Sequence, residues 1–275
     1  MSLKRFRLFV IGVSCLVMYY FWSNHTLTVT HHQIQLEKLP EALDGIKIVQ
    51  LSDLHDASFG SNQKRLIQKV NGLSPDLVVH TGDFVDSKRW TLEENLAVIR
   101  GIEAPQFYVT GNHEAWSARL DEVVAALEQE GVHVLRNEGI RLPLRGEALQ
   151  IFGMDDPAVG EQSKQLVASE MQSLDVSILL AHRPEAIESY RKLPVDIVFS
   201  GHAHGGQFRL PFIGGLVAPD QGFFPKWTAG MHEENEQYFV ISRGLGNSII
   251  PMRVGNRPEI VEVTLNKKHG QSLEK

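Results

Sequence analysis

Five short polar blocks in this chain carry side chains that could bind metal ions. Each follows an apolar run, and they are Asp53-Leu54-His55, Gly82-Asp83, Gly111-Asn112-His113-Glu114, Ala181-His182-Arg183 and Gly201-His202-Ala203-His204. Together they supply carboxylates, imidazoles and one amide, which are ligands of hard to borderline divalent cations. A single Asp or His in such a place is usually a cap or turn residue. Five blocks in this order predict a site for divalent metal ions.

The chemistry that fits such a site is phosphoester hydrolysis. A phosphoester is negatively charged and repels an attacking nucleophile, and hydroxide is scarce at neutral pH. Two divalent ions ~3.5–4 Å apart lower the pKa of bound water towards ~7 and neutralise the charge that develops on the phosphoryl oxygens. The site also needs a group that protonates the departing oxygen. These requirements predict a two-metal phosphoester hydrolase.

Strands that alternate with helices must position the five blocks. Apolar runs bounded by turn or polar residues predict buried strands, and amphipathic periods between them predict helices. The predicted strands are 46–50, 77–80, 107–110, 150–153, 178–181 and 197–200, and the predicted helices are 62–72, 91–101, 119–131, 164–173 and 185–191. Either Ser117 or Asp121 could begin the third helix, and Gly131 suits its C-terminus.

This alternation predicts an α/β fold with largely parallel strands. Two further strands, 237–243 and 259–265, have no helix between them, and residues 26–36 read as an edge strand. We therefore expect two mixed β-sheets packed as a sandwich with helices on the outer faces. In open α/β sheets, ligands bind beyond the carboxyl ends of the strands. Because all five blocks follow such ends, residues from Asp53 to His204 are expected to form one cluster.

The N-terminal segment differs from the rest of the chain. Three basic residues precede an uncharged run over 8–22, which is short for a spanning helix of ~20 residues. No small-x-small cleavage site follows, and the run ends in aromatic residues typical of a membrane interface. We interpret residues 1–25 as a single-pass anchor in the cell membrane, with a cleaved signal peptide and a secreted body as the alternative. Residues 26–275 would form an extracytoplasmic catalytic domain, because basic flanks stay in the cytoplasm.

Composition limits the partners of the chain. Its 275 residues carry a formal net charge of −6 and one cysteine, Cys15. One cysteine excludes an internal disulfide. No basic run offers a groove for a phosphate backbone, so a nucleic-acid partner is not expected. The pattern specifies no oligomeric state.

The five blocks resemble the motifs of the calcineurin-like metallophosphoesterases, which are D-x-H, G-D, G-N-H-[ED], a lone H and G-H-x-H. The resemblance runs from about residue 46 to the C-terminus, and its surroundings look more like the membrane-anchored bacterial branch. It implies the calcineurin-like phosphoesterase fold and two divalent metal ions. Mn²⁺ is expected first, because the ligands are mixed N and O without thiolate, and Zn²⁺ or Fe is compatible. The ligands implied are Asp53, His55 and His204 for the first ion, Asn112, His182 and His202 for the second, and Asp83 as a bridge.

The same resemblance implies catalytic roles and a substrate class. His113 would protonate the leaving oxygen or stabilise the transition state, and Asp86 would orient His113. The Asp86-Ser87 step lacks the substrate-binding Arg of the superfamily's protein phosphatases, and no Cys ligand or Tyr marks a purple acid phosphatase. We expect a phosphodiesterase or pyrophosphatase acting on a small or lipid-linked phosphoester, such as the UDP-acylglucosamine-type substrate that some similar proteins hydrolyse.

Other residues have two interpretations each. His80 is expected in the core or behind the ligands rather than as a ligand. Asp155 and Asp156 could approach the metals or form a turn, and Arg183 could contact a phosphate or form a surface ion pair. The apolar stretch 208–227 could pack over the second sheet as core, or form a wall beside the metals that faces the membrane.

The sequence therefore predicts a membrane-anchored, binuclear metal-dependent phosphohydrolase. One alternative is a non-catalytic metal-binding envelope protein, which would be expected to lack His113 or Asn112, and both are present. Another is a nuclease of the same superfamily, which would need a basic groove with aromatic side chains for stacking.

Overall fold

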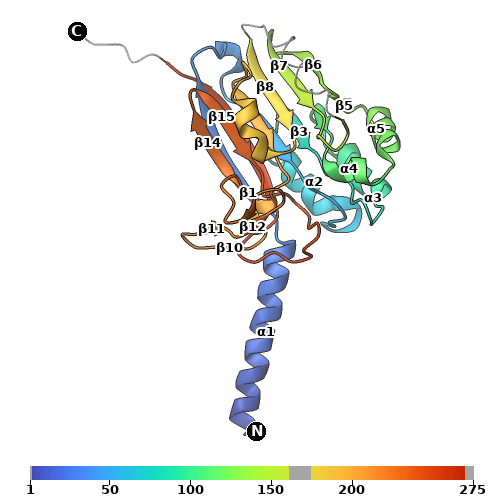
Figure 1. Cartoon of the computed structure of the whole chain (residues 1–275), viewed down its shortest axis with the longest axis vertical. Helices are drawn as coiled ribbons and strands as arrows, with labels where there is room; N and C mark the ends of the chain where they lie inside the picture. The colour runs from blue at the N-terminus through green and yellow to red at the C-terminus, as the bar shows by residue number, and fades with distance from the viewer. Residues whose placement is uncertain (1, 161–174, 270–275) are drawn as a thin grey trace, which may run out of the picture.

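A long helix projects from a body built around two β-sheets in the computed structural model, which describes residues 2–160 and 175–269 (Figure 1). This helix, α1 (Leu3–His25), exposes nearly all of its side chains. Among the described residues it is the one helix long and apolar enough to cross a membrane, with a mean hydropathy of 1.5. The predicted helix over 164–173 lies outside the described residues.

The first sheet has the strand order β1-β16-β2-β3-β4-β5. Strands β2 to β5 run parallel, while β16 is antiparallel to β2 and parallel to β1. Because β1 ends the sheet, the predicted edge strand is confirmed. The strands are β1 (Thr28–Leu36), β16 (Glu259–Lys267), β2 (Ile46–Leu51), β3 (Leu77–Thr81), β4 (Gln106–Val109) and β5 (His133–Val134).

The second sheet has the order β14-β15-β9-β8-β7-β6, with antiparallel hairpins at both edges and parallel strands between them. The outer strands β6 and β14 were not predicted, because exposed and half-buried residues alternate in them without a continuous apolar run. The strands are β6 (Glu138–Leu144), β7 (Glu147–Met154), β8 (Val176–Ala181), β9 (Ile197–Ser200), β15 (Gln237–Ile241) and β14 (Gly230–Glu234).

The two sheets pack face to face, and helices cover their outer faces. Strand residues alternate between these environments: Ile48 and Val79 lie between the sheets, while Val49 and Val78 face the helices. The helices are α2 (Lys64–Asn71), α3 (Leu92–Gly101), α4 (Asn112–Trp116), α5 (Leu120–Gln129) and α7 (Ile187–Tyr190), with 3₁₀ turns η1 (Glu41–Leu43), η2 (Ser61–Gln63), η3 (Pro184–Ala186) and η4 (His204–Gly206). The predicted α/β sandwich with outer helices is confirmed.

One predicted helix cap is wrong. Helix α5 begins at Leu120 with Arg119 as its N-cap residue, and no side chain caps it. Asp121 lies in the first turn instead, where its carboxylate interacts favourably with the helix dipole. Gly131 follows the helix with a φ of +83°, as expected for its C-terminal end.

Helix α1 joins the body at the edge where the parallel strands end. Strand β1 runs antiparallel to β2, so its first residue, Thr28, lies at the carboxyl end of β2. Two short hairpins, β10 (Arg209–Leu210) with β11 (Gly214–Gly215) and β12 (Val217–Ala218) with β13 (Gly222–Phe223), lie at the same edge beside the helix (Figure 1). We call the edge of the sandwich where the parallel strands end the carboxyl edge.

Candidate metal centre

All predicted ligands lie at the carboxyl edge just after a strand, in loops or at the start of a short helix or 3₁₀ turn. Each of their side chains is buried. In chain order they follow β2 (Asp53, His55), β3 (Asp83), β4 (Asn112), β8 (His182) and β9 (His202, His204). The structure thus brings together seven residues that are up to 151 positions apart in the chain, counting from 53 to 204.

The backbone at several of these residues is strained. Asp53, His55, Asp83, His202 and His204 all have positive φ, between +46° and +61°, which residues with a β-carbon adopt uncommonly. Hydrogen bonds between neighbouring loops hold this conformation, from the Asp53 N–H to the Gly82 carbonyl and from the His55 N–H to the Asp83 carbonyl, both 3.0 Å. Such strain is characteristic of functional sites whose surroundings fix an unfavourable conformation.

A first cluster consists of Asp53, His55, Asp83 and His204, each with one potential ligand atom within 4.8 Å of the others. The Nε2 atoms of His55 and His204 face each other at 3.2 Å, and His204 Nε2 lies 3.5 Å from Asp53 Oδ1. Burial lowers the pKa of His55 and of His204 to about 3. Both imidazoles are therefore neutral at pH 7, which is the form that binds a metal ion.

A second cluster surrounds Nε2 of His182, which lies 3.2 Å from Asp83 Oδ2, 3.2 Å from Asn112 Oδ1 and 3.1 Å from His202 Nδ1. The other nitrogen of His182 must donate to the carbonyl of Thr81, 2.6 Å away, because a carbonyl only accepts. Likewise, Nε2 of His202 donates to a carboxylate oxygen of Asp220 at 3.1 Å. Both rings thus direct a lone pair into the cluster, as metal-binding histidines do.

Asp83 lies between the two clusters. Its Oδ2 is 3.2 Å from His182 Nε2 and 3.7 Å from His55 Nε2, and its Oδ1 accepts the N–H of His113 at 2.8 Å. Burial alone would raise the pKa of Asp83, but His182 and His55 outweigh it and lower that pKa well below its ordinary value. The same attraction overcomes the burial of His182 and raises the pKa of its imidazole. Without a metal ion, a proton on His182 therefore balances the carboxylate.

The donor sets fit two divalent cations. Carboxylate oxygens, imidazole nitrogens and one amide oxygen converge on two points, and lone pairs face lone pairs at hydrogen-bond distance. In addition, Nδ1 of His55 is buried without a hydrogen-bond partner. Facing acceptors repel one another unless a proton or cation lies between them. The fold and the two clusters indicate a binuclear divalent metal site.

His113 lies beside the first cluster, with its ring 4.5 Å from that of His55. Its Nδ1 accepts the backbone N–H of Ser87 at 3.1 Å, so the neutral ring carries its proton on Nε2, which lies 3.0 Å from Ser248 Oγ. Asp86 Oδ2 is 3.7 Å from His113 Nδ1, which is too long for a hydrogen bond. Ser87 rather than Asp86 therefore fixes the ring directly.

Glu114 supports the Asp83 loop and was not predicted as a site residue. Its buried carboxylate accepts the N–H groups of Asp83 (3.0 Å), Val85 (3.1 Å) and Gly111 (2.7 Å). Burial, together with Asp83, raises its pKa to about 7. Its place at the end of the G-N-H-E block was the available sequence signal.

Arg253 also escaped prediction, and it connects the metal centre to α1. Its side chain is 1% exposed, and one guanidinium nitrogen lies 3.5 Å from Nδ1 of His204. The backbone of Arg253 accepts hydrogen bonds from Ser23 (2.9 Å) and Asn24 (3.1 Å) and donates to Asn24 (2.7 Å). The last turn of α1 is therefore tied to a segment that contacts a predicted ligand.

Three of the residues with two interpretations form hydrogen bonds or ion pairs within the protein. Arg183 forms ion pairs with Asp156 (2.7 Å) and Asp220 (2.6 Å), as the ion-pair interpretation predicts. Asp155 accepts from Thr110 Oγ1 at 2.9 Å and pairs with Arg136, so it lies behind the site. His80 is buried, with Nε2 3.0 Å from Gln106 Oε1, which agrees with its expected place in the core.

A cavity of about 400 Å³ opens next to His113. Its lining includes the basic residues Lys88 and Arg89 and the apolar residues Trp116, Ile249 and Pro251. Both Trp116 and Ile249 are exposed. The cavity can thus accept an anionic group together with an apolar one.

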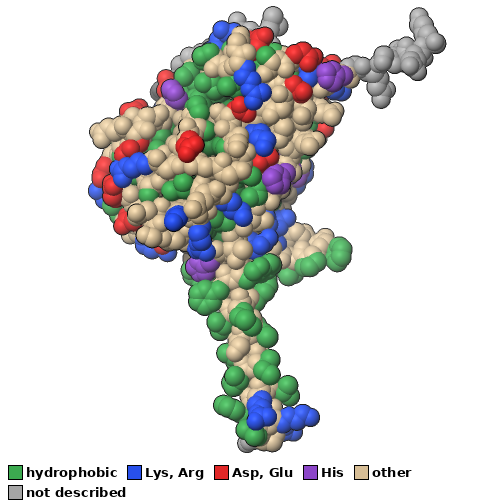
Figure 2. Space-filling model, turned by 180° about the vertical axis from the view of Figure 1, so that it is seen from behind, with side chains coloured by type: hydrophobic (Ala, Val, Ile, Leu, Met, Phe, Trp, Pro, Cys, Tyr) green, Lys and Arg blue, Asp and Glu red, His purple; other side chains and the backbone are tan. Residues whose placement is uncertain are grey.

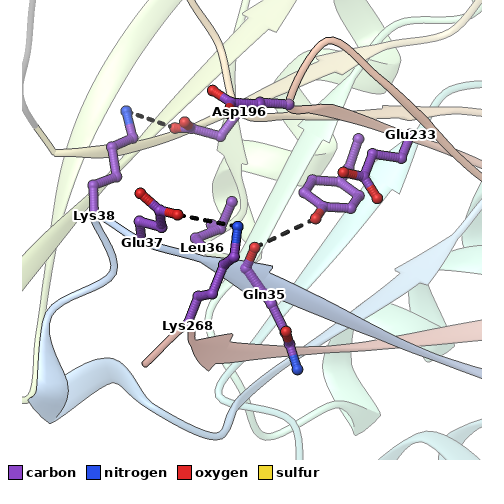
Figure 3. Close-up of a pocket in the computed structure, with 9 residues that line it drawn as sticks. Gln35, Leu36, Glu37, Lys38, Asp196, Glu233 and Lys268 are labelled. Carbon is purple, nitrogen blue, oxygen red and sulfur yellow. Dashed lines mark hydrogen bonds and ion pairs between the residues drawn. The ribbon is translucent and has the colours of Figure 1, made fainter. Parts of the chain in front are cut away.

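A different pocket lies at the opposite edge of the sandwich (Figure 3). Both of its lysines form ion pairs, Lys38 with Asp196 at 2.9 Å and Lys268 with Glu37 at 3.0 Å. Tyr238 donates to the carbonyl of Gln35 at 3.3 Å. None of the metal-type clusters found among the described residues includes a residue that lines this pocket.

Comparison with known proteins identifies the family. The model of the calcineurin-like phosphoesterase family matches residues 46–206. Metallophosphoesterase YkuE of Bacillus subtilis is 33% identical over 249 residues, which are 88% of this chain and 86% of that protein. Phosphodiesterase YaeI of Escherichia coli is 29% identical and covers 80% of this chain and 82% of its own length.

A relative from Danio rerio, a transmembrane protein with metallophosphoesterase domain, is 32% identical over 255 residues. The match covers 86% of this chain and 56% of that longer protein. The family model spans all seven predicted ligands and His113, and the two clusters supply the donors for two metal ions. The chain belongs to the calcineurin-like phosphoesterase family and is a metal-dependent phosphohydrolase.

Proposed function

We propose that this chain is a two-metal phosphodiesterase or pyrophosphatase that acts on an amphiphilic phosphoester at the outer surface of the membrane. The observation that carries this proposal is the shared position of three features: the metal clusters, the cavity beside His113 and the end of α1 all lie at the carboxyl edge. A substrate held in the membrane next to α1 would meet the metal centre directly.

The roles proposed for the ligands follow the two clusters. Asp53, His55 and His204 would hold one ion, Asn112, His182 and His202 the other, and Asp83 both. The ions would lower the pKa of bound water and neutralise the phosphoryl oxygens. We propose Mn²⁺, because the donors are nitrogen and oxygen without thiolate.

His113 would act on the leaving group. Its Nε2 lies 3.0 Å from Ser248 Oγ, and both residues line the cavity. The hydrogen bond from Ser87 to Nδ1 keeps this orientation. The ring could therefore stabilise negative charge on the departing oxygen, or transfer a proton to it.

The substrate proposal follows from the two kinds of side chain, basic and apolar, that line the cavity. Lys88 and Arg89 could interact with a second phosphate, as in a pyrophosphate, or with another anionic group. Trp116 and Ile249 could pack against an acyl chain or another apolar group. A lipid-linked sugar nucleotide of the UDP-acylglucosamine type has both parts, and a phosphodiester with one apolar substituent is the simpler member of the class.

The orientation proposal rests on charge at the start of the chain. Lys4, Arg5 and Arg7 precede the apolar part of α1, and positive flanks usually remain in the cytoplasm. Residues 1–25 would then be a retained anchor, and residues 26–275 would form the catalytic domain on the outer side.

Hydrolysis of two aryl phosphates tests the proposal. Full-length protein in detergent, stripped of metal and given Mn²⁺, should hydrolyse bis-p-nitrophenyl phosphate faster than p-nitrophenyl phosphate. A matched His113→Ala variant should lose this activity. Preference for the monoester, or activity that persists after metal removal, would contradict the proposed reaction.

A further inference from the structure

The exposed apolar side chains of the body gather at one place. In the described part of the body, every large apolar side chain that is exposed belongs to α4, to the short hairpins or to a loop at the carboxyl edge. Most belong to the segment after η4, which we call the apolar arm (residues 208–227). These side chains are Trp116, Leu210, Phe212, Ile213, Phe223, Phe224, Ile249 and Met252.

One part of the arm fits the interpretation as core, and another part does not. Trp227 is buried and packs with the outer side of the second sheet, as the core interpretation predicts. Phe212 is fully exposed, and Phe223 and Phe224 are 81% and 72% exposed, so the tips of the arm are not core. Apolar clusters of this kind usually mark an interaction surface.

Hydrogen bonds hold the arm in a defined conformation. A bond from the Phe224 N–H to the Leu216 carbonyl (2.9 Å) closes the β12–β13 hairpin, and a bond from the Leu216 N–H to the Phe208 carbonyl (2.9 Å) ties it to the start of the arm. The Gln221 side chain bonds both backbone polar groups of Trp227, at 2.7 and 3.0 Å. The exposed phenyl groups are therefore presented by a folded element.

The arm lies at the level of the last turns of α1. Phe208 pairs with Val254, and the Arg209 N–H donates to the Val254 carbonyl at 2.9 Å. The neighbouring Gly255 N–H donates to the Tyr19 hydroxyl of α1 at 2.8 Å. In Figure 2 a projection with green side chains extends from the body beside the top of the helix.

Basic side chains occupy the same level. Arg257 lies over the ring of Trp22 in α1 at 4.8 Å, and Arg65 and Lys69 line a pocket with His25 at the end of that helix. On the arm, Lys226 lies over the ring of Trp227 at 4.1 Å. Exposed apolar side chains with basic side chains nearby are typical of proteins that bind the interface of an anionic membrane.

We propose that the apolar arm is a second membrane contact, which inserts Phe212, Ile213, Phe223 and Phe224 into the leaflet where α1 ends. This inference rests on the proposed function only in placing α1 in a membrane. One helix alone would let the body tilt, whereas a helix and an arm together hold the carboxyl edge against the lipid. The arm also carries Asp220, which bonds the predicted ligand His202, so its position matters to the metal centre.

Depth measurements on the full chain test the proposal. Cys15 is the one cysteine of the chain, so a Cys15→Ser background allows single labels at Phe212→Cys and Phe223→Cys. A polarity-sensitive fluorophore is attached, and the protein is placed in phosphatidylcholine–phosphatidylglycerol vesicles with or without brominated acyl chains. Glu37→Cys, at the exposed opposite edge, is the matched control.

We expect blue-shifted emission and strong quenching by brominated lipid at residues 212 and 223, and neither effect at residue 37. If the labels at residues 212 and 223 emitted at the same long wavelength as the label at residue 37, they would be in water, and the proposal would be overturned. A blue shift without quenching by the brominated lipid would also overturn it, because the arm would then contact a second copy of the chain. The readout needs no turnover, so it stands even where the proposed reaction fails.

A kinetic experiment tests whether the membrane contact affects catalysis. The double variant Phe223→Ser with Phe224→Ser should raise KM several-fold for an acylated phosphodiester in vesicles. It should leave hydrolysis of soluble bis-p-nitrophenyl phosphate unchanged. Equal loss on both substrates would indicate a structural defect and contradict a role in membrane contact.

Discussion

Ionisable side chains gather at both edges of the β-sandwich, and they are satisfied in different ways. At the edge shown in Figure 3, Lys38 pairs with Asp196 and Lys268 with Glu37, and both lysines are more than a third exposed. At the carboxyl edge, buried carboxylates and imidazoles face one another, and most of their close neighbours are also acceptors.

The difference shows which cluster requires a ligand. Exposed ion pairs complete each other and are screened by water, so they contribute ~0–1 kcal/mol each and need no added ion. Buried acceptors that face acceptors have lost their hydration without gaining a partner. His182 shows the consequence, because Asp83 holds a proton on it when no cation is present. The direction of lone pairs, more than the number of acidic residues, therefore identifies a metal site.

The largest expected effect comes from Asp83, which lies between the clusters. Asp83→Asn should lower kcat on bis-p-nitrophenyl phosphate by on the order of 10³-fold, because it removes charge at the centre of the site. Bound metal should fall below two ions per chain. Glu37→Gln at the opposite edge is the control and should change neither value. Two tightly bound ions and normal turnover in Asp83→Asn would break the contrast between the edges.

His113 should separate chemistry from metal binding. His113→Ala should reduce kcat by ~10²–10⁴-fold, the usual size of a general acid–base contribution. Both metal ions should still bind, because this ring points to Ser248 rather than into either cluster. Steady-state kinetics with parallel metal analysis checks this, and loss of metal would reassign His113 as a ligand.

Asp220 should have a smaller effect that acts through His202. Asp220→Ala removes the acceptor of His202 Nε2–H and should weaken metal affinity by ~10–100-fold. Competition with a fluorescent chelator measures the change. Asp220→Asn should recover part of the metal affinity, because its amide oxygen can still accept the hydrogen bond from His202 Nε2–H. An affinity equal to that of the unaltered chain would show that the bond to His202 is incidental.

The smallest effect is expected at the edge of paired charges. Lys38→Ala removes the ion pair with Asp196 and should change the free energy of unfolding by no more than ~1 kcal/mol. Denaturant unfolding measures this value, and activity should be unchanged. A large loss of activity would mean that the two edges are coupled.

Much of the fold was predictable because its central strands are buried on both faces. Continuous apolar runs such as those of β3 and β8 have few other interpretations. Strands β6 and β14 lack such runs, since their outer positions meet solvent. The N-cap residue of α5 depends on how the preceding loop folds. Residue preference alone therefore predicted Ser117 or Asp121 instead of Arg119.

The site divides in the same way. The predicted ligands belong to compact blocks at strand ends, so their spacing and the topology together place them in one cluster. Asp220 and Arg253 come from long loops that no periodicity positions, and they become recognisable only through contacts with His202 and His204. The sequence left two interpretations of the apolar arm for another reason. An apolar composition is expected both for side chains that pack on a sheet and for side chains that enter a membrane.

The number of divalent ions bound by the full chain tests the central claim most directly. Metal-stripped protein in detergent is titrated with Mn²⁺, and bound metal is counted by elemental analysis after removal of the excess. The two-cluster arrangement predicts two ions per chain. A folded chain that binds none would contradict it.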